Sequence, residues 1–173
     1  IRLVDNKLIM KDEKEYESLI KMANKISKVE LLGDFLRKGE FEKLFNLVGV
    51  INQSDPAQNY LKDAEKIYFQ RFNDNEKVND LYNVLICQIL QRKVESAEKT
   101  INLILEKDFS NGNAQLAKSI INLYLLDKKD ARISLNNAKI YNKSNDSAEI
   151  INIVEGLTYF LEFKFVNAFK ILT

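Results

Sequence analysis

The residue types that most often carry catalysis are nearly absent from this chain. Its 173 residues include no histidine, no tryptophan and a single cysteine, Cys87. Serine and cysteine nucleophiles are usually activated by a neighbouring base, most often histidine, so the composition excludes histidine-dependent catalysis and histidine-ligated metal sites. One cysteine cannot form a disulfide within the chain. Cys87 ends the apolar run 84–87, and we expect it to be a small, buried thiol.

The carboxylates show no arrangement typical of a catalytic or metal site. They are spread along the chain and often lie near a lysine, as Glu95 does four residues before Lys99. Pairs at that spacing are typical of the solvated face of a helix. No loop has the Asp-x-Asp-x-Asp spacing of a calcium site. The sequence therefore predicts a protein that is not an enzyme and that holds neither a metal nor a cofactor.

Charge and hydropathy narrow the class of partner. The chain has 26 Lys and Arg against 25 Asp and Glu, a formal net charge of +1. A nucleic-acid footprint needs a clustered basic face, and a membrane span needs an apolar run of about 18 residues. The sequence has neither, so we expect no nucleic-acid partner and no direct membrane span. The composition is compatible with the cytoplasm or with a bacterial periplasm.

The side chains must be positioned by helices, because apolar residues recur at helical spacing from Lys11 onward. Residues 1–10 lack this period and are expected to be an extended N-terminal segment, with a turn at Asp5 and Asn6. Residues 11–38 form either one long helix or two helices separated near Asn24.

Turn and capping residues divide the remainder. Gly39 marks a helix end, and Asp55 with Pro56 marks a helix start, because Asp caps free N–H groups and Pro fits the first turn. Helices are expected at 41–53, 56–72, 77–92, 95–108, 112–126, 129–142, 147–163 and 165–173, with a turn at 73–75. Short loops between helices of this length predict a string of antiparallel helical hairpins.

An internal repeat runs through the second helices of these hairpins. A small residue followed by a large one four positions on occurs as Ala97-x3-Ile101, Ala131-x3-Leu135 and Ala168-x3-Leu172. The three alanines are 34 and 37 residues apart, and the second repeat also has Ala138 seven positions on. Small residues at these positions allow two helices to approach closely.

The first helices carry a matching half. Gly156 and Tyr159 precede Ala168, and Phe35 precedes Leu44 by the nine residues that separate Tyr159 from Ala168. This pattern resembles the tetratricopeptide repeat family. The sequence departs from the family pattern at three positions: Gln88, Glu155 and Phe109.

The resemblance implies an all-α fold, a right-handed α-solenoid of about five antiparallel hairpins with nine to ten helices. The repeat domain spans 11–173. Its units are 25–58, an irregular helix at 59–77, 78–111, 112–145 and an incomplete unit at 149–173.

The last unit ends without the polar capping helix that repeat arrays normally have. We expect Phe165, Phe169 and Leu172 to be uncovered. This predicts a fragment of a longer repeat protein, or an end that docks on another molecule, and self-association through the uncapped C-terminal helix.

In the family that this chain resembles, first helices line a concave groove where partner peptides lie. On that basis Tyr82 and Ile86 are candidate groove residues, and Lys118 with Asn122 resemble the start of a clamp for a C-terminal carboxylate. The next unit has Val154 where the clamp needs a polar residue, so an apolar groove fits the sequence better.

The function that these observations imply is a non-enzymatic scaffold or assembly protein of chaperone type, which binds a partner peptide or helix on its concave face. The alternative is a regulatory or docking domain of a larger enzyme whose catalytic part lies outside this chain.

Overall fold

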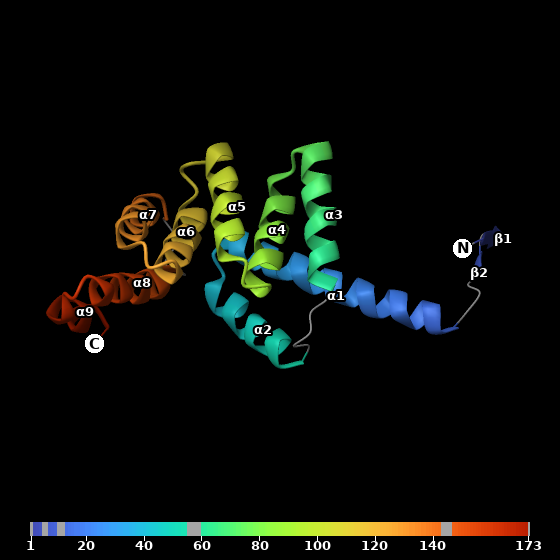
Figure 1. Ribbon diagram of the computed structural model, residues 1–173, viewed down its shortest axis with the longest axis horizontal. Coiled ribbons are helices and arrows are strands. Elements are labelled where there is room, and N and C mark those ends of the chain that lie inside the picture. Colours follow the sequence, from blue (N-terminus) through green and yellow to red (C-terminus); the bar gives the residue numbers. More distant parts are fainter. Residues whose placement is uncertain (1, 5–6, 10–12, 55–59, 143–146, 173) are drawn as a thin grey trace.

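The computed structural model describes residues 2–4, 7–9, 13–54, 60–142 and 147–172, with side-chain environments for 24–49, 60–142 and 147–172. These ranges contain nine helices and one short pair of antiparallel strands (Figure 1). The strands are β1 (Arg2–Val4) and β2 (Lys7–Ile9), and the helices are α1 (Glu13–Lys38), α2 (Phe41–Ser54), α3 (Tyr60–Asn75), α4 (Val78–Leu90), α5 (Val94–Lys107), α6 (Gly112–Tyr124), α7 (Lys128–Tyr141), α8 (Ala148–Leu161) and α9 (Phe165–Leu172).

The all-α class is thus confirmed, with β1 and β2 inside the segment expected to be extended. The predicted turn at Asp5 and Asn6 and the predicted helix start at Asp55 and Pro56 lie outside the described residues. No helix in the described ranges has the length and apolar character needed to cross a membrane.

Helix α1 is continuous, which settles the choice between one helix and two across 11–38. It ends at Gly39, whose φ of 78° places it in the left-handed region that favours glycine. The Gly39 N–H donates to the Leu36 carbonyl, and the Glu40 N–H donates to the Phe35 carbonyl. This pair of hydrogen bonds is the Schellman motif, which satisfies carbonyls that the helix end leaves free.

The same turn closes three later helices. Arg92, Leu126 and Phe163 have φ values of 59°, 61° and 61° and follow α4, α6 and α8. Each turn repeats the two hydrogen bonds of the Schellman motif. These residues are 34 and 37 positions apart (126 − 92 and 163 − 126), which is the spacing of the three alanines. The sequence repeat therefore has a structural counterpart, the hairpins α4–α5, α6–α7 and α8–α9.

The predicted repeat-packing residues are buried or half-buried. Phe35 packs partly buried against the core and Tyr159 is half-buried. Gly156 is buried. A Cβ at this position would lie 2.6 Å from Cγ of Leu172, so α8 and α9 approach each other closely here. The other five predicted residues are at most 6% exposed: Leu44, Ala97, Ala131, Ala138 and Ala168.

The predicted turn at 73–75 is wrong, because α3 continues through these residues to Asn75. The Gln70 side chain donates to the Asp74 carboxylate at 2.8 Å, and the Asn75 amide donates to the Arg71 carbonyl at 3.2 Å. Both hydrogen bonds join residues one helical turn apart. They stabilise the helical conformation of Asn and Asp residues, whose intrinsic helix propensity is low. The chain leaves the helix at Glu76, with φ of 51°.

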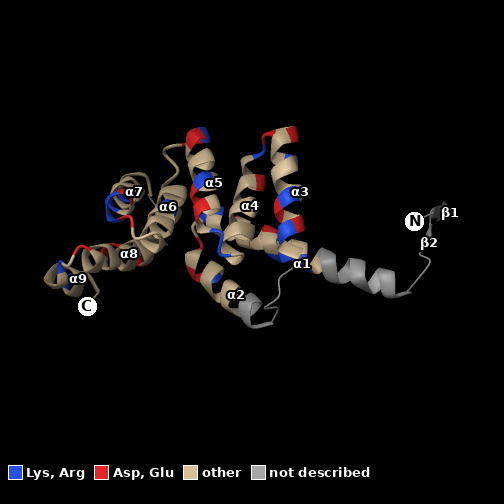
Figure 2. Cartoon of the chain, in the orientation of Figure 1, with Lys and Arg blue, Asp and Glu red and all other residues tan. Residues whose placement is uncertain are grey.

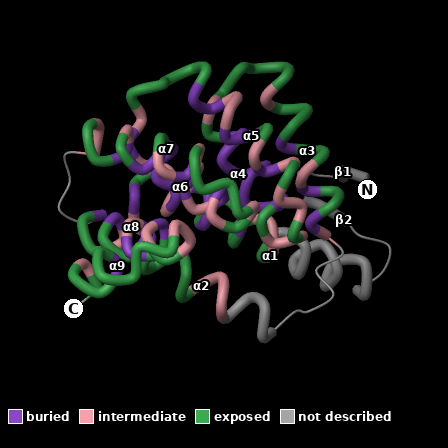
Figure 3. The backbone as a smooth tube through the Cα atoms, turned by 60° about the vertical axis from the view of Figure 1, so that its left-hand side comes forward, coloured by how far each residue is buried: buried purple, intermediate pink, exposed green. Residues whose placement is uncertain are grey.

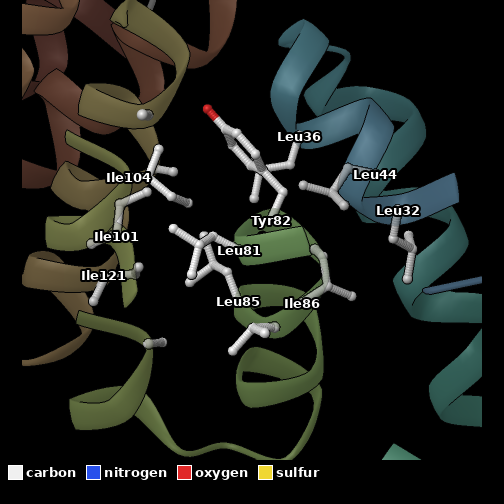
Figure 4. Close-up of a cluster of buried hydrophobic side chains, with 14 of the residues drawn as sticks. Leu32, Leu36, Leu44, Leu81, Tyr82, Leu85, Ile86, Ile101, Ile104 and Ile121 are labelled. Atoms are coloured by element: carbon white, nitrogen blue, oxygen red, sulfur yellow. The ribbon is translucent and has the colours of Figure 1, made fainter. Parts of the chain in front are cut away.

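Helix α4 is the centre of the body. Every residue from Asp80 to Gln88 is buried, because α1, α3 and α5 all pack against α4 (Figure 3). A helix that is apolar around most of its circumference is stable only when it is enclosed in this way. The core residues from α1, α4 and α5 meet in one cluster (Figure 4).

The first helix crosses the array. Its C-terminal half packs against α4 and also reaches α6, whereas α2 packs mainly against α1 (Figure 1). The fold is therefore not a simple stack of successive hairpins, because α1 contacts both α4 and α6, which are the first helices of two different hairpins.

Candidate functional site

The structure corrects the predicted groove. Tyr82 and Ile86 are each 1% exposed, so neither lines an open surface. Leu32 and Leu36 of α1 lie in the same buried cluster as these two α4 side chains (Figure 4). The sequence pattern places Tyr82 and Ile86 on one face of α4 correctly, but that face is covered by the chain's own first helix.

The predicted clamp is corrected as well. Asn122 is 1% exposed, and neither Nδ2 nor Oδ1 of its side chain has a hydrogen-bond partner among the described residues. Lys118 lies one turn earlier and is half-buried. A carboxylate clamp needs both side chains at an open surface, and Asn122 is enclosed.

Cys87 has the environment of a structural cysteine. It is 0% exposed, and burial raises the pKa of its thiol to about 12. The thiolate is the reactive form, so this cysteine is unsuited to nucleophilic chemistry. Among the described residues, no group of three histidine, cysteine or acidic side chains could hold a metal ion.

A cleft of about 300 Å³ lies between α1, α3 and the start of α4. Several of its charged groups pair with one another: Arg71 contacts Glu30 at 3.5 Å and Asp80 at 3.2 Å, and Arg37 contacts Asp34 at 2.5 Å. The second carboxylate oxygen of Asp80 is buried and has no hydrogen-bond partner among the described residues. Hydrogen bonds from Lys38 and Arg37 hold the pKa of Asp34 below its usual value. These pairs join α1, α3 and α4, and we assign the cleft to structure.

The surface that stands out is apolar and lies on the last two helices. Eight large apolar side chains of α8, α9 and the turn between them are 41–74% exposed. We call this set the apolar end face: Ile153, Leu157, Phe160, Phe163, Phe165, Val166, Phe169 and Leu172. Figure 2 shows few charges on α8 and α9, in contrast to the interspersed charges of α3 and α5.

Helical spacing gathers these residues on one side of each helix. Ile153, Leu157 and Phe160 lie at positions i, i+4 and i+7 of α8, and the same spacing recurs in α9 from Phe165 to Leu172. The rings of Phe160 and Phe163 pack edge-on against Phe165, with centroids 5.3 and 6.2 Å from it. The aromatic contacts make the two stripes one surface.

The area of the apolar end face is large for a chain of this size. An aromatic side chain presents about 200 Å², so the four phenylalanines, at 43–74% exposure, contribute roughly 500 Å² before the aliphatic residues are added. Contiguous apolar patches of this size mark interaction surfaces.

The expectation that Phe165, Phe169 and Leu172 are uncovered is confirmed, since they are 43%, 66% and 51% exposed. The α8 stripe and the turn residue Phe163 were not among the predicted site residues. The signal for the stripe was present in the i, i+4, i+7 spacing of residues 153, 157 and 160.

Ion pairs hold α8 in place on α7. The Arg132 guanidinium donates to both oxygens of Glu162, at 3.1 and 2.9 Å, and stacks 4.2 Å from the centre of the Tyr159 ring. Lys139 contacts Glu155 at 2.6 Å. Burial raises the pKa of Glu162, but the hydrogen bonds from Lys164 and Arg132 outweigh it, and the pKa lies below its usual value.

Comparison with family models, with curated proteins and with solved structures finds no match to this chain. The assignment of a function therefore depends on the surface that the fold presents.

Proposed function

We propose that this chain is a non-enzymatic protein–protein interaction module, a tetratricopeptide-like helical repeat that serves as a scaffold or assembly protein. The observation that carries the proposal is the apolar end face, on which eight exposed large apolar side chains, four of them phenylalanines, gather on two neighbouring helices and the turn between them. Exposed apolar side chains elsewhere are spread over several other helices and turns. Burying such a surface against a partner removes apolar area from water, which is the main source of binding energy in protein association.

The repeated turns support the tetratricopeptide-like interpretation. The three hairpins share one turn geometry, and each has a buried alanine five positions after its turn residue, such as Ala97 after Arg92. Hairpins with these shared features stack in a regular manner. Regular stacking of such hairpins generates a superhelix, which the family builds with a right hand.

The binding surface in this proposal differs from that of the family. The groove side of α4 is filled by α1, so the partner docks on the apolar end face instead of a concave groove. An end face made of two helices suits a folded or helical partner better than an extended peptide, because it has no exposed strand edge to pair with.

The proposal is tested by affinity capture with three forms of the chain. The double variant Val166→Gln and Phe169→Gln makes the apolar end face polar while it keeps good helix formers. The control is Ile67→Gln, which removes an exposed apolar side chain, 46% exposed, from α3 instead. We expect a protein that the unchanged chain and the control both retain and that the double variant loses.

Quantitative mass spectrometry of the captured proteins gives the result. Recovery of the same proteins by all three forms would show that the apolar end face is not the binding surface. Circular dichroism of the double variant should show intact helices, because Val166 and Phe169 are 69% and 66% exposed and are not part of the buried core.

A further inference from the structure

We propose that Ile153 and Leu157 of α8 bind an amphipathic helix of another protein, in the way that α4 binds the chain's own first helix. This inference rests on the proposed function, because it names the partner of one part of the apolar end face. It follows from a comparison of equivalent positions in successive hairpins.

The left-handed turn residues define which positions are equivalent. Three pairs of residues lie ten and six positions before the turn residue that follows the first helix of a hairpin, as 92 − 82 and 92 − 86 show for α4. The pairs are Tyr82 and Ile86 in α4, Leu116 and Ile120 in α6, and Ile153 and Leu157 in α8. Equivalent positions of repeated hairpins face the same side of the array.

The exposure of these two positions increases along the array. In α4 both residues are 1% exposed, in α6 they are buried and half-buried, and in α8 they are 41% and 48% exposed. Phe160, about one turn further on, lies at the margin of this side, because its equivalent in α4, Ile89, is also 39% exposed. The difference between the hairpins is therefore concentrated at Ile153 and Leu157.

Helix α1 covers these positions on α4. Its large buried side chains among the described residues are Val29, Leu32 and Leu36, at positions i, i+3 and i+7. They belong to one core cluster with Tyr82 and Ile86 (Figure 4). This side of α4 is therefore filled by the apolar stripe of one helix.

Helix α1 ends before it reaches α8. Gly39, which ends it, lies against the Asn113 side chain at the start of α6, and the Asn113 amide donates to the Arg37 carbonyl at 3.1 Å. The helices that pack closely on α8 are α6, α7 and α9. Ile153 and Leu157 thus continue an interface that accepts a helix, and the chain's own helix stops one hairpin short of them.

The surroundings of Ile153 and Leu157 favour recognition by apolar contacts. Glu149 is exposed one turn before Ile153, and Lys170 is exposed on the neighbouring α9. Charges of both signs select neither an acidic nor a basic partner. The partner is therefore specified by its apolar side chains, and a stripe at positions i, i+3 and i+7, like that of α1, complements the α8 pair.

The experiment uses a synthetic peptide of residues 24–38, which carries the α1 stripe, as a probe of the 173-residue chain. Two control peptides each remove one property. Leu32→Gln with Leu36→Gln breaks the stripe, and Leu31→Pro keeps the stripe but prevents the helix. We expect the unchanged peptide to bind roughly tenfold more tightly than either control, with little difference between 0.05 M and 0.5 M salt.

Variants of the chain locate the contact. Backbone amide shifts should change at Ile153 and Leu157, and Ile153→Gln with Leu157→Gln should abolish binding of the peptide. Ile67→Gln is the control, because it replaces an exposed apolar residue of α3 and should leave binding unchanged. If circular dichroism shows that the double variant has lost helix, Leu157→Gln alone gives the test, and it should weaken binding roughly threefold to tenfold.

Several results would overturn the inference. They are equal binding of the three peptides, shift changes confined to helices other than α8, and no binding up to about 1 mM peptide. A dimer in 0.1 M salt that the Ile153→Gln with Leu157→Gln variant does not form would overturn it as well, because a second copy would then be the occupant.

The proposed function stands in all of these cases, since it requires only that a partner docks on the apolar end face. It fails on a different result, in which Val166→Gln with Phe169→Gln captures the same proteins as the unchanged chain.

Discussion

Two polar residues that interrupt the repeat pattern have specific partners in the structure. Gln88, at a position where the family favours an aromatic residue, donates to Glu65 at 3.0 Å and accepts from Thr100 at 2.8 Å. Glu155, at a position where the family favours leucine, pairs with Lys139. Sequence reasoning could mark these departures but could not explain them, because Glu65 is 23 residues from Gln88 and no local pattern joins them.

Gly112 provides a prediction at the residue scale. A Cβ at this position would lie 2.6 Å from the backbone nitrogen of Asn142 and 2.8 Å from its Cα. Backbone atoms cannot move aside as a side chain can, so Gly112→Ala should lower the free energy of unfolding by about 1–3 kcal/mol. Urea denaturation followed by circular dichroism measures the change.

The matched control is Gly49→Ala. Gly49 lies inside α2 and nothing is within 4 Å of the position of its Cβ. Alanine is the better helix former there, so this variant should be more stable than the unchanged chain by about 0.5–1 kcal/mol. Equal effects of the two substitutions on the free energy of unfolding would show that the start of α6 does not pack against the end of α7.

At the scale of elements, the helices were predictable and the docking of α1 was not. Apolar periodicity placed every helix from α4 to α9 to within three residues of its ends. Periodicity states which face of α4 is apolar, and it does not state which helix covers that face. Tyr82 and Ile86 were therefore assigned to a groove that α1 in fact fills.

The docking of α1 can be tested through Leu36. This side chain is 2% exposed and packs in the core cluster, so Leu36→Ala should cost about 2–5 kcal/mol of stability. Leu31 is on the same helix and is 45% exposed, and Leu31→Ala should change stability by less than about 0.5 kcal/mol. Similar values for the two variants in urea denaturation would mean that α1 does not pack on α4.

The contact between α7 and α8 gives a dependence on pH. The pKa of Glu162 is below its usual value in the folded chain, so the ionised carboxylate stabilises the fold at pH values above the unfolded pKa. This contribution is lost as the pH falls from about 4.5 through the lowered pKa. Glu162→Gln should therefore cost roughly 1 kcal/mol at pH 7 and almost nothing at pH 2–3.

Thermal unfolding of both forms across this pH range measures the difference. Because Asp34 and Glu65 also have lowered pKa values, the comparison between variant and unchanged chain is needed to isolate Glu162. A stability difference that is constant with pH would show that the carboxylate is not held by Arg132 and Lys164.

At the scale of the whole molecule, the sequence predicted one end of the body better than its middle. The repeat pattern predicted that Phe165, Phe169 and Leu172 of α9 are uncovered, and their exposure confirms this. The middle depends on contacts such as α1 with α6, between segments about 80 residues apart, and a short-range pattern contains no information on them.

The whole molecule also has a predicted response to salt. Lys128 lies 4.9 Å from the centre of the Phe163 ring and Lys170 is on α9. If two copies bury their apolar end faces so that these lysines lie close together, the repulsion between them extends about 10 Å in 0.1 M salt but only about 3 Å in 1 M salt. The chain should therefore sediment as a monomer in 0.1 M sodium chloride and associate in 1 M. The apolar attraction is not weakened by this change of salt, so the reduced repulsion between the lysines favours association.

Sedimentation velocity at both salt concentrations distinguishes this association from one driven by ion pairs. The variant Val166→Gln with Phe169→Gln should remain monomeric in both buffers, because it lacks the apolar contact, and Lys170→Gln should associate at lower salt than the unchanged chain. Association that is strongest in 0.1 M salt would mean that opposite charges hold the copies together, and the contact would then lie on the mixed-charge surfaces of α3 and α5, away from the apolar end face (Figure 2).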